Sequence, residues 1–426
     1  MIARSVKSGV KVRLKAMALQ PETRVLLAVV RGIARPAESC GLDVALQQVS
    51  DRDALVELAL RHGLIAQLHA ALESAPEPTQ ALVPGETRAR LVSLAGAIAV
   101  RSLRMTRQLL AIVGQLEKAS VPALALKGPA LSQLAYGDVT RRHSVDLDIL
   151  VRPADVHAAR VVLAAAGLVV DDSMADVLWA TVQVAEQEMV FVHPTTHLMV
   201  ELHWRIGPRF APDSLLADEL FARAGAVDLL GRATPTLSRA DSVLALTVHA
   251  STHEWYRLDD VATLCALLRT FTDSDWRALR SLARAHDCRR RLAVGLCLAR
   301  DLGGLSIQWP YSSLAGFPGA GGLSKEAEAF LLGCRPGWWA QLLRVGAGVK
   351  GDATAPDARS GRLDRALGVL WQARALDSRR AGLRHLWRRL STSGARDWAI
   401  ADDARPDWLP GPLAQLVRRQ RRLWGR

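Results

Sequence analysis

The stretch VDLDILV at residues 145–151 decides the fold that this sequence predicts. Apolar and acidic side chains alternate along it, which is typical of a strand with one face in the core. Asp146 and Asp148 then project from one face, whereas Leu147 and Ile149 point into the core. Two carboxylates held so close repel each other unless a cation lies between them. The stretch therefore predicts a strand that presents a cation site.

A second predicted strand, LMVELHW at residues 198–204, supplies a third carboxylate. Its even-numbered positions are apolar, so Glu201 and His203 share the opposite face. Three carboxylates on neighbouring strands make an oxygen cage that suits Mg²⁺ bound together with substrate phosphates. We expect Asp146, Asp148 and Glu201 to be the catalytic residues and the metal ligands.

The other elements of this unit follow from turn residues and periodicity. Residues 121–126 form a short apolar strand that ends at Lys127-Gly128-Pro129, and a short helix follows at 130–136. The remaining predictions are a polar loop at 137–144, a helix at 153–166 that ends before Gly167, a strand at 168–170, and a hairpin of 189–192 with 198–204.

Helical periodicity flanks this unit on both sides, so we predict an α+β protein. Its small mixed β-sheet core would lie between an N-terminal and a C-terminal helical domain. A chain of 426 residues has room for two to three domains of about 150 residues each. The predicted boundaries are 1–20 for a disordered or mis-called N-terminus, 21–118 and 226–334 for the helical domains, 119–225 for the core, and 335–426 for a basic helical tail.

The basic charge is concentrated in this tail. Lys and Arg number 55 against 42 Asp and Glu, a formal net charge of +13. Residues 335–426 hold 19 of the former and 8 of the latter, so most of the excess lies there. Such a tail can meet nucleic acid, an anionic membrane or an acidic partner, or it can be a solvated Arg-rich helical face.

Cysteine spacing and hydropathy indicate the compartment. The five cysteines are widely spaced and form no C-x-x-C pair, which argues against a disulfide framework or a zinc knuckle. No apolar run reaches 18 residues, and the basic N-terminus lacks the apolar segment of a signal peptide. We therefore expect a cytoplasmic protein without a membrane span.

Three stretches together resemble the uncharacterised bacterial nucleotidyltransferase family of the polymerase-β-like superfamily. They are ALKGPALSQLAYGDVTRRHSVDLDILV at 125–151, VELHW at 200–204 and HEWYRLDDVATL at 253–264. The resemblance covers residues 21–302, and the motifs are specific as a set. The matching positions are Lys127, Gly128, Tyr136, Asp138, Arg142, Asp146, Asp148, Glu201, His203 and Trp204.

The resemblance implies metal-dependent transfer of a nucleoside monophosphate from an NTP to a hydroxyl. ATP is the expected NTP and Mg²⁺ the expected cofactor, while the acceptor stays open among small molecules, peptides and proteins. Asp146 and Asp148 would bind metals that bridge the triphosphate, and Glu201 would complete the site and favour the attacking hydroxyl. Gly128 would let the backbone approach the phosphates.

The sequence departs from the wider superfamily at the phosphate-binding turn. The superfamily has Gly-Ser close before the acidic pair, but here Pro129 follows Gly128 and 17 residues separate Gly128 from Asp146. Proline has no N–H to donate. Phosphate binding is therefore expected from Lys127 as a point charge and Arg142 as a fork, with His203 beside Glu201 in the nucleotide site.

Two neighbouring acidic residues in the third stretch have different interpretations. Asp259 fits the N-cap of a helix, whereas Asp260 matches an acidic position of the family. Asp260 would line an acceptor pocket together with His253 and Arg257.

Two further interpretations concern the central loop and the histidines. Asp138 either caps a turn or orients Arg142. A zinc site of His193, His197 and His203 is disfavoured because the three span a turn without a cysteine partner.

Two other functions stay open. One is a non-catalytic binding protein that retains the fold, and the intact acidic triad argues against it. The other is an RNA-directed nucleotidyltransferase that uses the basic tail. The sequence lacks the interleaved aromatic and basic residues of single-strand binders, so nucleic acid is not the expected partner.

Overall fold

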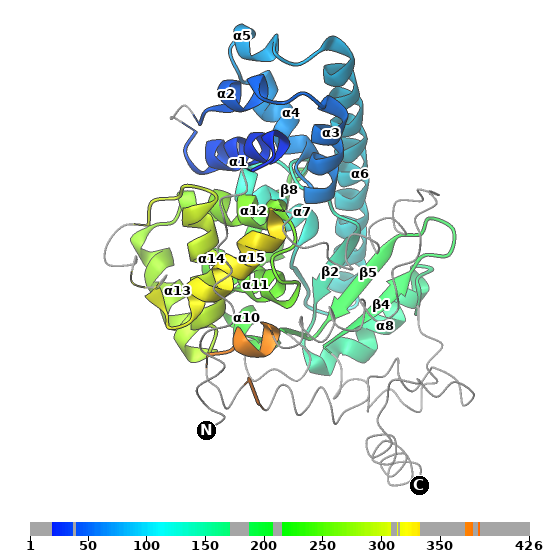
Figure 1. Cartoon of the computed structure of the whole chain (residues 1–426). Coiled ribbons are helices and arrows are strands. Elements are labelled where there is room, and N and C mark those ends of the chain that lie inside the picture. The colour runs from blue at the N-terminus through cyan, green and yellow to red at the C-terminus, as the bar shows by residue number, and fades with distance from the viewer. Residues whose placement is uncertain are drawn as a thin grey trace, which may run out of the picture.

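The computed structural model describes residues 19–36, 40–170, 187–207, 215–307, 313, 316–332, 371–377 and 382–383. Figure 1 shows the N-terminal helices stacked at one end, with the sheet and the C-terminal helices side by side beneath them. The expected N-terminal tail and most of the basic C-terminal tail lie outside the described residues.

A seven-stranded mixed sheet lies at the centre, in the order β3-β4-β5-β2-β1-β9-β8. β2 is parallel to β5 and β1 is parallel to β9, and the other neighbouring pairs are antiparallel. The strands are β1 (Leu124–Ala125), β2 (Asp146–Leu150), β3 (Val169–Val170), β4 (Glu188–Val192), β5 (Met199–His203), β8 (Gly225–Leu229) and β9 (Arg232–Thr236). β6 (Arg205–Ile206) and β7 (Leu215–Leu216) form a separate two-stranded sheet.

The predicted strands, the hairpin and the helix that follows β2 are confirmed. β4 and β5 pair antiparallel around residues 193–198. A 3₁₀ turn η1 (Pro153–Asp155) leads into α8 (Val156–Ala165), because proline suits the first turn of a helix. The sheet, however, extends past residue 225, where we expected the core to end. β8 and β9 are joined by the tight turn Leu230-Gly231, in which both residues have positive φ.

The N-terminal helices are α1 (Pro21–Ala34), α2 (Leu42–Gln47), α3 (Arg52–His62), α4 (Ile65–Glu73), α5 (Glu77–Gln80) and α6 (Gly85–Lys118). The segment between α4 and α6 contains only the one-turn helix α5. Asp51 caps α3 by accepting from the Ala54 N–H at 2.9 Å. Aspartate suits this position because its carboxylate satisfies an N–H that the first turn of the helix leaves without a partner.

The C-terminal helices are α10 (Ala217–Ala222), α11 (Arg239–Thr252), α12 (Leu258–Arg269), α13 (Asp273–Ala285), α14 (Arg289–Asp301) and α15 (Ala320–Leu331). They share one hydrophobic cluster with the N-terminal helices, in which α1 packs against α12. We expected two helical domains separated by the core. Their apolar faces instead bury each other, which removes more apolar surface from water than either set does alone.

The sheet has two chemically different faces. Leu147, Ile149, Val200 and Leu202 belong to a second hydrophobic cluster, built with α6 and α8. The side chains that alternate with them point the other way, and there the acidic residues gather. Period-two alternation on β2 and β5 thus separates core from site.

Part of the basic tail packs on the helical region. Asp377 accepts hydrogen bonds from the backbone N–H groups of Arg289 and Arg290, at 3.1 and 2.6 Å, and so caps the start of α14. Gln372 donates to the Thr252 carbonyl at 2.6 Å. Within the described residues, no helix combines the length and the apolar character that a membrane crossing requires.

Candidate active site

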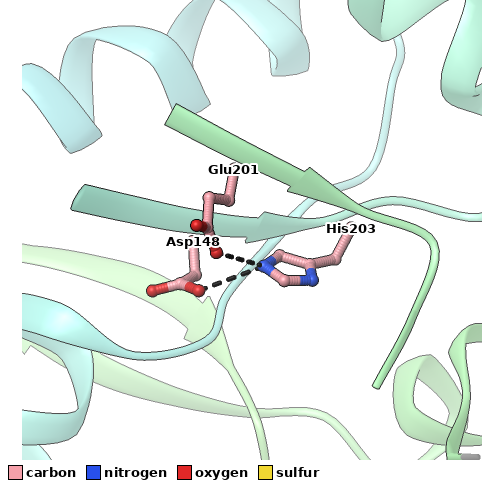
Figure 2. A group of neighbouring side chains, drawn as sticks. All are labelled: Asp148, Glu201 and His203. Atoms are coloured by element: carbon pink, nitrogen blue, oxygen red, sulfur yellow. Dashed lines mark hydrogen bonds and ion pairs between the residues drawn. The ribbon is translucent and has the colours of Figure 1, made fainter. Parts of the chain in front are cut away.

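Asp148 and Glu201 are brought together by strand pairing. The parallel register of β2 and β5 places Asp148 directly opposite Glu201 and Leu150 opposite His203. Figure 2 shows the side chains of Asp148, Glu201 and His203 converging on one point. One ligand atom from each lies within 4.8 Å of the others. A carboxylate pair and an imidazole at this spacing make a donor set that fits a divalent cation.

The imidazole of His203 is held from both sides. Its Nε2 lies 3.0 Å from Asp148 Oδ1 and 3.4 Å from Glu201 Oε2. Its Nδ1 lies 3.2 Å from Glu188 Oε2 on β4, where Glu188 is the register partner of His203. The ring is buried, whereas about a third of the Glu188 side chain is exposed. Glu188 was not among the expected site residues.

Lys127 reaches the same carboxylate from the turn before α7 (Gly128–Tyr136). Its Nζ lies 2.7 Å from Asp148 Oδ1. The helix begins at Gly128 with φ +55°, a left-handed conformation that side chains disfavour. A Cβ at this position would lie 3.4 Å from Ser144 Oγ and 3.6 Å from the Asp146 carbonyl oxygen. These are ordinary van der Waals distances, so the left-handed φ, and not a lack of space, is what favours glycine at the turn that carries Lys127.

Charge pairing inside the site outweighs burial for three groups. Burial alone would raise the pKa of Asp148, but Lys127 and His203 hold it well below its usual range. Burial would lower the pKa of Lys127, but Asp148 and Glu201 raise it well above its usual range. Burial would likewise lower the pKa of His203, but its hydrogen bonds to Asp148 and Glu201 raise that pKa to about 10.

Asp146 lies on β2 two residues before Asp148. It points to the same face, and its register partner on β5 is Met199. Burial, together with the charges of Asp148 and Glu201, raises its pKa to about 7. A cation bound at this end of β2 would relieve the same repulsion between carboxylates.

Arg142 does not lie in the acidic cluster, although the sequence predicted that it binds phosphate. Its Nε donates to Asp259 Oδ2 at 2.9 Å and its Nη2 to Asp260 Oδ1 at 2.7 Å. The guanidinium is 10% exposed and the two carboxylates at most 5%. Because both donors hold buried carboxylates, Arg142 links the loop before β2 to α12, and its expected role in phosphate binding stays a prediction.

The predicted roles of Asp259 and Asp260 change accordingly. Arg257, rather than Asp259, is the N-cap of α12. Asp259 accepts from Gln67 on α4 at 3.3 Å in addition to Arg142, so it joins all three regions of the chain. Asp260 is buried against Arg142, with 5% of its side chain exposed.

Asp138 caps a turn, as one of its two interpretations held. Its Oδ1 accepts from the Thr140 N–H at 2.8 Å and from the Thr140 hydroxyl at 2.7 Å. Its Oδ2 lies 3.1 Å from Arg141 Nε, so it orients Arg141 and not Arg142. The His193 ring accepts from the N–H groups of Thr195 and Thr196, which is a turn contact.

Two histidines of the helical region feel the charges of the cluster; His253 was expected to line an acceptor pocket, whereas His249 was not assigned to any site from sequence. His249 on α11 and His253 stack edge to face with centroids 4.7 Å apart. Burial, followed by the charge of Lys127, lowers the pKa of His253 to about 4. Their helical spacing of four residues is a signal that sequence alone carries, but it does not say which face meets the sheet.

The comparisons with known proteins identify the family of this chain. The chain belongs to an uncharacterised nucleotidyltransferase family, whose model matches residues 48–304, and it is therefore a transferase. A solution structure of the antibiotic-resistance factor ANT(2'')-Ia is similar at a TM-score of 0.33 and 12% sequence identity, over 44% of this chain and 93% of that chain. A search of the curated proteins finds no match.

Proposed function

We propose that this protein transfers a nucleoside monophosphate from an NTP, with ATP as the expected donor, to a hydroxyl of an acceptor. The observation that supports this most is the convergence of Asp148, Glu201 and Lys127 on the polar face of the sheet. Asp146, Asp148 and Glu201 would hold Mg²⁺. When bound, the ion would neutralise the phosphate oxygens and orient the triphosphate.

The chain's own residues have separable roles in this proposal. Lys127 shares Asp148 with the cation site, so its ammonium can turn to a phosphate oxygen once a cation binds the carboxylate. Gly128 leaves the turn free of a Cβ where the triphosphate would approach. Glu201 is the most exposed of the three donors in the group, with 19% of its side chain accessible, and it would accept the proton of the attacking hydroxyl.

The reaction conserves atoms and charge with these groups. The hydroxyl oxygen forms a bond to the α-phosphorus, and the bond from that phosphorus to the β-bridging oxygen breaks. Pyrophosphate leaves, and the hydroxyl proton passes to Glu201. The rate acceleration would come mainly from positioning and charge neutralisation, because phosphoryl transfer requires little covalent catalysis by the protein.

The test is incubation of the full chain with each α-³²P-labelled NTP, Mg²⁺ and a pool of metabolites, peptides, proteins and RNA. We expect labelled product with wild type and none with Asp148→Asn. Asp43→Asn on exposed α2 is the matched control and should behave as wild type. Nucleotide binding without labelled product would favour a non-catalytic protein, and label confined to added RNA would favour an RNA-directed enzyme.

A further inference from the structure

The two nitrogens of His203 have different surroundings. Nδ1 faces the single carboxylate of Glu188 at 3.2 Å, on the side away from the acidic pair. Nε2 faces both Asp148 and Glu201, at 3.0 and 3.4 Å. Three adjacent strands, β4, β5 and β2, supply these groups, so the arrangement is built into the sheet and not into a loop.

This geometry matches a common arrangement of histidine ligands in metal sites. A histidine that binds a metal through one nitrogen usually donates its other N–H to a carboxylate, which fixes the tautomer and the ring orientation. Glu188 stands where that carboxylate would be. Ligands with bonds of about 2.1 Å lie about 3.0 Å apart at right angles and about 3.4 Å apart at tetrahedral angles. The distances from Nε2 to Asp148 and Glu201 are those of neighbouring ligands of one ion.

We propose that His203 Nε2 is a ligand of the cation held by Asp148 and Glu201, and that Glu188 is its positioning residue. This rests on the proposed function and goes beyond the all-carboxylate site expected from sequence. Imidazole suits first-row transition ions, whereas carboxylates alone suit Mg²⁺. The site of Asp148, Glu201 and His203 therefore prefers a first-row transition ion such as Zn²⁺ to Mg²⁺.

The competing explanation is that His203 is an imidazolium that replaces a cation. In that case Nε2 donates to Asp148 and Glu201 and never contacts a metal. The two explanations differ in an observable way. A ligating nitrogen couples magnetically to a bound paramagnetic ion, and a displaced imidazolium does not.

The experiment uses the full chain and Mn²⁺ alone. Calorimetry measures Mn²⁺ affinity, and pulsed EPR of histidine-¹⁵N-labelled protein detects nitrogen bound to the ion. We expect a nitrogen coupling in wild type and its loss in His203→Gln. Glu188→Ala should lower Mn²⁺ affinity about 10- to 100-fold, as loss of an outer partner does. Glu188→Gln should retain most of it, because its amide oxygen still accepts from Nδ1–H.

The matched control is Glu219→Ala. Glu219 lies 3.1 Å from His286 Nε2, so this change removes a carboxylate from a histidine outside the site. We expect no change in Mn²⁺ affinity there, and circular dichroism confirms that each variant is folded.

Three results would overturn the inference: no Mn²⁺ binding, bound Mn²⁺ without nitrogen coupling, or equal affinities for Glu188→Ala and Glu219→Ala. The proposed function fails separately. Nitrogen coupling with no NTP turnover under any divalent ion would leave the metal site standing and refute the transferase. Turnover with Mn²⁺ bound but without nitrogen coupling would refute the ligand role of His203 and leave the transferase standing.

Discussion

Replacement of Arg142 by methionine tests how the site is tied to the rest of the molecule. The change keeps most of the side-chain volume but removes the charge that Asp259 and Asp260 share. Both carboxylates are buried, with side-chain exposures of 0% and 5%. Loss of one partner from a buried ion pair costs about 3–5 kcal/mol, because the remaining charge stays desolvated. We expect a loss in this range in the free energy of unfolding.

Two further variants separate charge from geometry. Arg142→Lys keeps the charge but has no planar fork, so it loses one charge-assisted hydrogen bond, worth about 1.5–3 kcal/mol. Arg141→Met is the matched control. Its partner Asp138 and its own side chain are each 39% exposed, so we expect a loss of at most about 1 kcal/mol.

The assay is urea unfolding at pH 7, with equal denaturant slopes required for comparison. The ion-pair explanation is refuted if Arg142→Met and Arg141→Met are equally stable. Nucleotide affinity decides between the structural and the phosphate-binding roles of Arg142. A variant that is as stable as wild type but has lost ATP affinity would restore the role predicted from sequence.

Three other predictions concern separate parts of the chain. Asp148→Asn should lower transferase activity by about a hundredfold or more with the fold retained, measured by steady-state kinetics, since even an outer metal partner is worth 10- to 100-fold; unchanged turnover would refute the site. Burial, followed by the charge of Arg61, lowers the pKa of His62 to about 4. The unfolded chain then binds this proton more strongly, so stability present above pH 6.5 is lost as the pH falls toward 4. Between pH 7 and pH 5, the free energy of unfolding measured in urea should fall by about 2 kcal/mol less in His62→Asn than in wild type. Equal falls in the two proteins would contradict the lowered pKa of His62. Asp377→Ala should cost about 1 kcal/mol as the lost cap of α14, and unchanged stability would show that the tail contact is not formed in solution.

Local pattern determined which residues face the site. Period-two alternation alone put Asp146 and Asp148 on one face of β2 and Glu201 and His203 on one face of β5. The register then confirmed that Asp148 and Glu201 are neighbours. The alternation of a strand and the residue preferences of a turn depend on residues adjacent in sequence, so both can be predicted from the sequence alone.

Some features were readable in the sequence but were not used. The alternation in β8 and β9 and the two-residue turn at Leu230-Gly231 predict a hairpin, which extends the sheet beyond residue 225. Glu188 directly precedes the predicted strand at 189–192. Its importance follows only from its pairing with His203, which no spacing within the chain reveals.

The partners of the charged side chains were decided by tertiary structure. Arg142 lies four residues before Asp146, so sequence distance assigned it to the phosphate site. In the fold it points to α12, more than a hundred residues away in sequence, and pairs with Asp259 and Asp260. The packing of the N- and C-terminal helices into one hydrophobic cluster likewise depends on contacts between residues far apart in sequence. The sequence of an amphipathic helix shows that its apolar face must pack against something. It does not show which surface of the protein that is. The hydrophobic effect is non-directional, so the arrangement that buries the most apolar surface depends on contacts along the whole chain.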